Sequence, residues 1–322
     1  MKFRIITFLL FVSLPTCAQD GLKSFGSIKN RDDLARFAII GDLTGGERSG
    51  VFKVAAEGIK AMQPDFILSI GDLIEGGIED VDVLNKEWST FRTNLDNDNL
   101  VFFPTVGNHD ISNMVMRDWY TKTVGPRYYH FKYKNMLFLI LDSEDFTLEF
   151  FTKLKKLRND AIEVYKKNPE EFIKTPYAKM PQRKYGEMSK KQSNYFVEII
   201  NANKDVIWTY ILMHKPLWQN DKEKEFKKLE KALKGRKYTV FNGHVHTYEY
   251  TQRFGHDYIQ LATSGGEQTV KEGNNMDHIL WVSADKEGPQ YLNIKLDGMR
   301  DKQGQIPANG NSLCFDTYEC KN

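Results

Sequence analysis

The sequence predicts an α/β protein built from two facing β-sheets with helices outside them. In the first third of the 322-residue chain, apolar runs alternate with amphipathic stretches, at 37–41, 51–62, 66–71, 80–95 and 101–106. Near-continuous apolar strands between helices indicate sheets that are covered on both faces. A second series of helices and strands follows without a Pro/Ser-rich linker, so we expect a single domain over residues 19–300.

The second series begins with a predicted hairpin, whose strands at 128–133 and 136–141 flank Lys134-Asn135. Helices are expected at 150–167, 189–201 and 221–234, and strands at 206–213 and 238–242. From residue 247 the pattern becomes β-rich, with candidate strands at 256–263, 279–284 and 290–296. Residues 301–322 form a turn-rich C-terminal tail, which we expect to be poorly ordered except near its cysteines.

The first 18 residues have the pattern of a secretory signal peptide. A basic head with Lys2 and Arg4 precedes an apolar stretch at 5–14, and small residues around Cys17 offer a cleavage site. The apolar stretch is too short for a transmembrane helix, and the residues before Cys17 fit a lipid-anchor signal poorly. We therefore expect export to the periplasm or the extracellular space. A buried N-terminal helix is the alternative.

Charge and cysteine content give no sign of a nucleic-acid partner or of a disulfide-rich scaffold. The chain has 45 basic and 43 acidic residues, and removal of residues 1–18, which hold two basic residues, leaves 43 of each. Cys314 and Cys320 then remain, and an oxidising compartment would let them close a small loop. No later stretch is long and apolar enough for a transmembrane helix.

The segment 151–191 is unusually basic, with 12 Lys or Arg residues, 5 Asp or Glu residues and 3 prolines. A charge run of this kind is typical of a solvated insertion at the surface. The alternative is a cap that attracts an anionic substrate toward a site.

Short polar motifs follow the apolar runs at the points where the predicted strands end. They are Asp42, Asp72, Gly107-Asn108-His109-Asp110, His214 and Gly243-His244-Val245-His246. Carboxylate, amide oxygen and imidazole suit hard or borderline divalent ions rather than thiophilic ones. The motifs hold four of the seven histidines, whereas His130, His256 and His278 match no motif and are interpreted as structural. The pattern therefore predicts a site for two divalent metal ions.

In order, spacing and strand-end placement, these motifs resemble the calcineurin-like metallophosphoesterase family from about residue 36 to 265. The resemblance implies a four-layer α/β/β/α sandwich of two mixed sheets flanked by helices, with the site at the carboxyl ends of the strands. It also implies two divalent ions (Mn, Fe, Zn or Mg) and a small phosphorylated substrate. A hydroxide that bridges the metals would hydrolyse a phosphate mono- or diester.

The resemblance assigns a role to each motif residue. Asp72 would bridge the two metals, Asp42 and His246 would hold the first, and Asn108, His214 and His244 would hold the second. His109 would assist catalysis from beside the metals, and Asp110 would orient its imidazole.

One departure concerns the first motif, which is usually Asp-x-His in this family but has Thr44 at the third position. The first metal site thus lacks an imidazole. A hydroxyl or water could replace it, and Glu75 could reach inward, although a solvated Glu75 is the simpler interpretation. This departure motivates an alternative function, a catalytically weak metal- or phosphate-binding protein with an incomplete first site.

Other residues near the motifs give weaker signals. Arg48 is a candidate contact for substrate phosphate, with an exposed loop arginine as the default. Gly45-Gly46 and Gly265-Gly266 could let backbone N–H groups approach phosphate, although each pair is more typical of a turn. Trp218 either walls the pocket or packs in the core.

Overall fold

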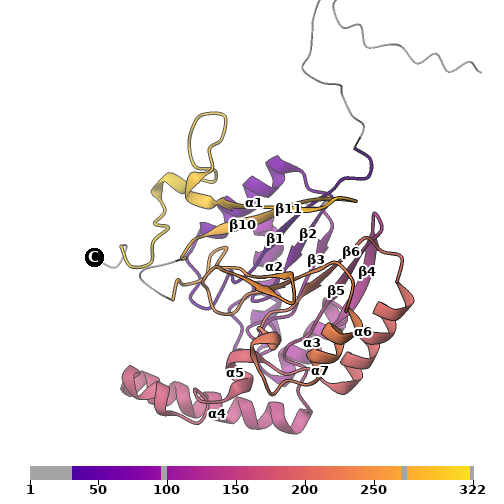
Figure 1. Cartoon of the computed structure of the whole chain (residues 1–322). Helices are drawn as coiled ribbons and strands as arrows, with labels where there is room; N and C mark the ends of the chain where they lie inside the picture. Colours follow the sequence, from indigo (N-terminus) through magenta and orange to yellow (C-terminus); the bar gives the residue numbers. More distant parts are fainter. Residues whose placement is uncertain (1–30, 96–99, 270–273, 320–322) are drawn as a thin grey trace, which may run out of the picture. The chain divides into compact units, whose positions relative to one another are not determined.

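Two mixed β-sheets form the centre of the computed structural model (Figure 1). The structure describes residues 31–95, 100–269 and 274–319, so the predicted signal peptide, Cys17 and Cys320 lie outside the described residues. Residues 33–322 make up one compact unit, and the account below concerns this unit. Among the described residues, no helix has the length and apolar content required to cross a membrane.

The first sheet has the strand order β11-β10-β1-β2-β3. Its strands are β1 (Ala35–Ile40), β2 (Phe66–Ser69), β3 (Phe102–Phe103), β10 (His278–Asp285) and β11 (Gly288–Lys295). β1, β2 and β3 run parallel, and β10 pairs antiparallel with β1. The parallel strands therefore end at the same edge of the sheet, where the first three polar motifs begin.

The second sheet has the strand order β4-β5-β6-β7-β9-β8. Its strands are β4 (Tyr129–Tyr133), β5 (Met136–Ile140), β6 (Trp208–Leu212), β7 (Tyr238–Asn242), β8 (Glu249–Arg253) and β9 (His256–Gln260). The four central strands run parallel, and the outer strands β4 and β8 are antiparallel to their neighbours. The motifs that contain His214 and His244 follow β6 and β7.

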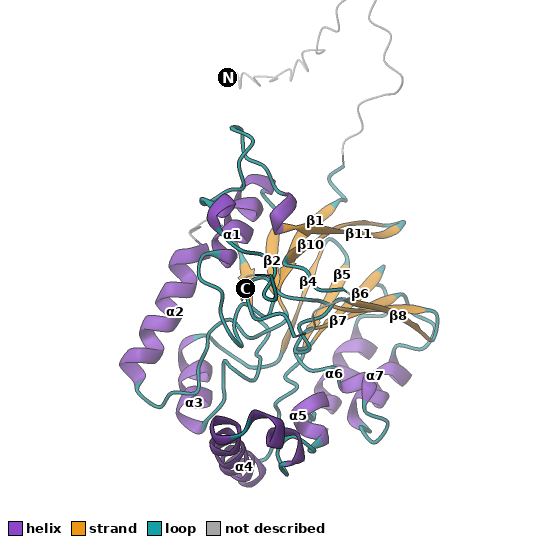
Figure 2. Ribbon diagram, turned by 90° about the vertical axis from the view of Figure 1, so that its left-hand side faces the viewer, coloured by secondary structure: helices purple, strands orange, loops and turns teal. Residues whose placement is uncertain are grey.

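Helices cover the outer face of each sheet (Figure 2). One cluster of buried side chains joins the first sheet to α1 (Val51–Met62), α2 (Val81–Leu95) and α3 (Met114–Thr123). A second cluster joins the other sheet to α6 (Lys190–Ala202) and α7 (Glu225–Ala232). A third, rich in aromatic rings, lies between the sheets. These three clusters separate four layers, which confirms the predicted α/β/β/α sandwich.

The insertion between β5 and α6 contains α4 (Leu148–Lys167), the 3₁₀ turn η1 (Pro169–Lys174) and the short helix α5 (Pro181–Tyr185). α4 begins at Thr147, whose hydroxyl accepts the N–H of Phe150, a standard N-cap arrangement. A β-bridge between Glu144 and Glu187 closes the base of the insertion. The chain therefore leaves and re-enters the sandwich at one place, next to the ends of β5 and β6.

The structure differs from the sequence prediction in several elements. α3 is missing from the prediction because its many polar residues leave no clear apolar periodicity. Its N-cap is Asn113, whose side chain accepts the N–H of Met116. The predicted helix at 221–234 is shortened to α7. In the C-terminal tail, Leu313 and Phe315, the two neighbours of Cys314, pack against the cluster that contains α1. Cys314 is disulfide-bonded.

The ring of Phe138 links the two sheets, so its loss should destabilise the whole sandwich. This side chain of β5 is fully buried and lies 5.4 Å from the rings of Phe37 and Phe66 in the opposite sheet. We expect Phe138→Ala to lower the free energy of unfolding by about 3–5 kcal/mol, measured by denaturant titration. Phe254→Ala is the matched control, because Phe254 is 69% exposed. Equal losses in both variants would contradict this account of the core.

Candidate metal centre

The polar motifs meet where the loops after β1, β2, β3, β6 and β7 converge. Four of their residues have a left-handed backbone: Asp42 (φ 50°), Asp72 (φ 55°), His244 (φ 74°) and His246 (φ 61°). This conformation is uncommon for residues other than glycine and is strained, and such strain gathers at functional sites. The loops thus hold these four side chains in positions that regular secondary structure would not allow.

A tight cluster of donors forms around His214. Its Nε2 lies 3.1 Å from Oδ2 of Asp72, 3.2 Å from Oδ1 of Asn108 and 3.2 Å from Nδ1 of His244. One ligand atom from each of Asp72, His214 and His244 falls within 4.8 Å of the others. One carboxylate, one amide oxygen and two imidazoles around a common point are a donor set that fits a divalent cation.

Backbone carbonyls fix which ring nitrogen of each histidine faces this cluster. Nδ1 of His214 lies 2.8 Å from the carbonyl oxygen of Ile70, and Nε2 of His244 lies 2.9 Å from that of Arg183. When one ring nitrogen donates its proton to a carbonyl, the other nitrogen is the one that can give up its proton to bind a cation. His214 therefore offers Nε2 to the cluster, and His244 offers Nδ1.

Charge is concentrated in this buried cluster. Burial alone would raise the pKa of Asp72, but the charges of His214 and His109 hold it below its usual range. Burial alone would lower the pKa of His214, but the neighbouring Asp72 carboxylate outweighs it and raises that pKa to about 9. An anionic carboxylate at the end of a buried strand is suited to bind a cation.

Asp42 and His246 form the second group that the sequence predicts. Nε2 of His246 lies 3.4 Å from Oδ1 of Asp42, and its Nδ1 contacts the carbonyl oxygen of Glu267. Both carboxylate oxygens of Asp42 lie 3.1 Å from the backbone nitrogen of His244. The structure therefore presents an Asp–His pair beside the larger cluster, as the expected first metal site requires.

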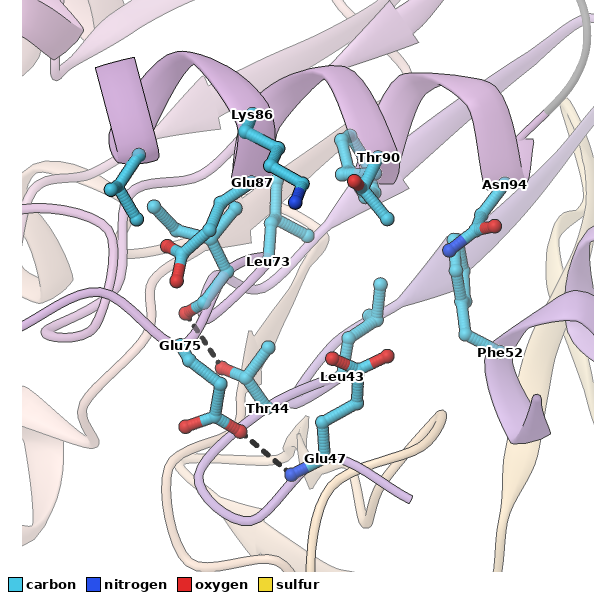
Figure 3. A pocket seen from close by; sticks show the side chains of 13 residues that line it. Leu43, Thr44, Glu47, Phe52, Leu73, Glu75, Lys86, Glu87, Thr90 and Asn94 are labelled. Carbon is cyan, nitrogen blue, oxygen red and sulfur yellow. Dashed lines mark hydrogen bonds between the residues drawn. The ribbon is translucent and has the colours of Figure 1, made fainter. Parts of the chain in front are cut away.

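The hydroxyl of Thr44 faces the backbone carbonyl oxygens of Ile74 and Asp72, not the candidate ligand side chains. It donates to the carbonyl oxygen of Ile74 at 2.8 Å and borders a pocket beneath α2 (Figure 3). Glu75 does not reach inward either, because its Oε1 accepts the backbone N–H groups of Gly46 and Glu47 at 3.0 and 2.6 Å. Neither residue supplies the missing imidazole of the first site.

The backbone of Gly45 lies next to the imidazoles of His246 and His109. A Cβ at this position, where φ is 78°, would lie 3.0 Å from Cε1 of His246 and 3.6 Å from Nε2 of His109. Glycine is therefore required here for close approach as well as for its φ angle. Gly266 is likewise required for close approach, because a Cβ there would lie 2.4 Å from the carbonyl oxygen of Thr44.

His109 is half-buried and lies beside Asp72. Its backbone N–H donates to Oδ1 of Asp72 at 2.8 Å, and its Nδ1 lies 2.7 Å from the carbonyl oxygen of Glu75. This carbonyl, and not Asp110, orients the ring. His109 therefore presents Nε2 toward the loop that contains Gly45.

Asp110 has a different role from the predicted one. Its carboxylate accepts the backbone N–H groups of Asp72, Leu73 and Gly107 at 3.0, 2.9 and 2.8 Å. Burial and the charge of Asp72 raise the pKa of Asp110 to about 7, against the effect of these hydrogen bonds. Asp110 thus joins the loops after β2 and β3 and positions Asp72.

Arg48 connects distant segments and does not line the candidate metal centre. Its guanidinium contacts the buried carboxylate of Asp277 and donates to the carbonyl oxygens of Gly266 and Phe315 at 3.0 and 3.2 Å. Arg48 therefore joins the loop after β1 to the C-terminal tail, and the predicted contact with substrate phosphate is not its role in this structure.

The remaining sequence candidates are structural. Trp218 donates to Oδ1 of Asn242 at 3.0 Å and packs on Tyr258. Imidazoles outside the motifs each have a local partner: His130 contacts the hydroxyl of Tyr195, His256 stacks on Tyr238, and His278 accepts the N–H of Ala262.

The sequence interpretation missed Arg183, whose carbonyl oxygen holds His244, and the buried ion pair of Lys215 with Glu144 at 2.5 Å. The basic composition of 151–191 draws attention to the segment that contains Arg183, but not to its backbone carbonyl. Lys215 directly follows His214 and gave no signal, because a lysine in a loop is ordinarily exposed.

Comparisons with known proteins agree with this geometry. The family model for calcineurin-like phosphoesterases matches residues 35–248. A search of curated protein sequences found no match. Solved structures with the same fold include GAP50, the anchor in the inner membrane complex of Plasmodium, with 16% identity and a TM-score of 0.54 over 85% of this chain and 87% of that one.

Two further structures share the fold. A dimetal phosphatase from Danio rerio has 14% identity and a TM-score of 0.54, over 81% of this chain and 98% of that one. PhoD has 10% identity and a TM-score of 0.52, over 82% of this chain and 68% of that one. At these identities the likeness establishes the fold alone.

The position of Thr44 predicts that it supports the fold and does not bind metal. Thr44→Val keeps the shape but leaves the carbonyl oxygen of Ile74 without this donor, so we expect a loss of about 1–3 kcal/mol in unfolding free energy. Elemental analysis should find the metal content unchanged. His246→Ala, which removes a candidate ligand, should lower it. A similar loss of metal in both variants would place Thr44 at the metal after all.

The Arg48 contacts predict an effect on stability and none on substrate affinity. Arg48→Leu leaves the buried carboxylate of Asp277 unpaired, which should cost about 3–5 kcal/mol by thermal or denaturant unfolding. The double variant Arg48→Leu/Asp277→Asn should recover part of this loss because the uncompensated charge is gone. A raised KM for a phosphate ester with unchanged stability would instead support the role in substrate binding.

Proposed function

Because the chain belongs to the calcineurin-like phosphoesterase family, we propose that it is an exported metallophosphoesterase that hydrolyses a phosphate mono- or diester of a small substrate. The observation that carries this proposal is the donor set of Asp72, Asn108, His214 and His244 at the carboxyl ends of the strands. The export step rests on the sequence of residues 1–18 alone.

Each residue at the site has a task that its geometry permits. One divalent ion would be held by Asn108, His214 and His244. The other would be held by Asp42 and His246, and Asp72 would bind both ions. Two such cations would supply a hydroxide at neutral pH and neutralise the phosphoryl oxygens. Asp110 and the carbonyl oxygen of Ile70 keep the ligands in place before substrate arrives.

His109 is the candidate proton donor to the leaving oxygen. Its Nδ1 is engaged by the carbonyl oxygen of Glu75, so a proton on Nε2 makes the ring a cation next to the carboxylate of Asp72. A positioned imidazolium of this kind can pass its proton to an alkoxide leaving group as the ester bond breaks. No protein nucleophile is needed for such a hydrolysis.

The alternative of a catalytically weak metal- or phosphate-binding protein is favoured by one observation, the orientation of Thr44 away from the first metal site. Metal content and the hydrolysis of two phosphate esters distinguish the two functions. The purified protein should bind two metal equivalents and hydrolyse p-nitrophenyl phosphate or bis-p-nitrophenyl phosphate with added Mn²⁺, and Asp72→Ala should abolish turnover. One equivalent of metal without turnover in any added ion would support the alternative.

A variant of His109 tests the assignment of the proton donor. We expect His109→Ala to lower kcat by about 10²–10⁴-fold with an unchanged metal content, because the ring contributes no ligand atom. The deficit should be larger for glycerol phosphate than for p-nitrophenyl phosphate, whose leaving group needs no proton. His256→Ala, a change of an imidazole outside the site, is the control. An equal deficit for both esters would argue against proton donation.

A further inference from the structure

A hollow beside the candidate metal centre is lined by basic side chains from the insertion. Asn108 borders both the metal centre and this hollow, so the two spaces are adjacent. The basic side chains around it are Lys155, Arg158, Arg183 and Lys215, and we call this space the basic hollow. Three of the four come from the insertion, Lys155 and Arg158 from α4 and Arg183 from α5.

The basic side chains differ in whether their charge is already paired. Lys155 contacts Glu79, and Lys215 forms its ion pair with Glu144. Within the described residues, the guanidinium groups of Arg158 and Arg183 form no hydrogen bond or ion pair, although both side chains are half-buried. Because burial is costly for an uncompensated charge, both groups would be stabilised by an anion in the hollow.

The position of the Arg183 guanidinium is restrained by aromatic rings. The Arg183 group lies over the rings of Phe172 and Tyr177, at 5.3 and 5.7 Å from their centroids, and the carbonyl oxygen of the same residue holds His244. Stacking on aromatic rings restrains a guanidinium while leaving its N–H donors available. Nη1 of Arg158 lies 3.9 Å from where a Cβ on Gly77, in the loop after β2, would stand.

We infer that the basic hollow binds a second phosphoryl group of the substrate while the first lies at the metal centre. The inference rests on the proposed function and narrows it to small substrates with two phosphoryl groups. The planar fork of guanidinium N–H donors matches phosphate oxygens in pairs. A second phosphoryl group would supply the anion that Arg158 and Arg183 lack. The distance between the hollow and the metal centre would favour substrates whose two phosphoryl groups are separated by a matching length.

Binding can be measured without turnover. The probes are alkane diphosphonates with two to six carbons, each compared with the alkylphosphonate of the same length, by calorimetry on the Mn²⁺-loaded protein. We expect the best diphosphonate to bind at least 10-fold more tightly than its monophosphonate. Arg158→Ala should remove most of this difference, and Arg158→Lys should keep part of it. Lys166→Ala is the control, because Lys166 lies on the same helix and pairs with Glu163 at the surface.

Hydrolysis provides the second readout. The ratio of kcat/KM for fructose 1,6-bisphosphate to that for fructose 1-phosphate should fall about 10-fold in Arg158→Ala and stay constant in Lys166→Ala. The inference is overturned if the native protein binds diphosphonates and monophosphonates equally, or if Arg158→Ala keeps the full difference. Failure of the proposed function has another signature, namely no hydrolysis of p-nitrophenyl phosphate by the native protein with any divalent ion.

Discussion

The buried carboxylate of Asp110 is the constraint on which the candidate metal centre depends. It accepts three backbone N–H groups from the loops after β2 and β3, which would otherwise be unsatisfied in the interior. These bonds fix the left-handed turn at Asp72 and aim its carboxylate at His214. Without them, the loop after β2 would relax toward an unstrained backbone and the donors around His214 would separate.

The sandwich makes this arrangement possible because its parallel strands end together. The loops that follow β1, β2 and β3 in one sheet, and β6 and β7 in the other, lie in one region. The aromatic cluster between the sheets packs the two sheets against each other. The strained residues sit on loops whose ends are anchored by fully buried strands. Rigid packing beneath the loops therefore offsets the cost of the left-handed conformations above them.

Sequence predicted the layers, and it named side chains that the structure brings together, because both depend on local patterns. Apolar runs that end in Asp or His mark strands and their carboxyl ends, and the order of the motifs identified the family. The failures were contacts between distant residues. Arg48 bonds to Asp277 across 229 positions, and the carbonyl oxygen of Glu75, not the adjacent Asp110, holds His109. Such partners are set by how loops fold over each other, which no spacing in the chain encodes.

The hydrogen bond between His244 and the carbonyl oxygen of Arg183 links the insertion directly to the candidate metal centre. Because α5 orients this candidate ligand ring, binding of a cation would be coupled to the position of the insertion. By linkage, a change that stabilises the insertion would raise the affinity for the cation, and a bound cation would stabilise the insertion by the same free energy.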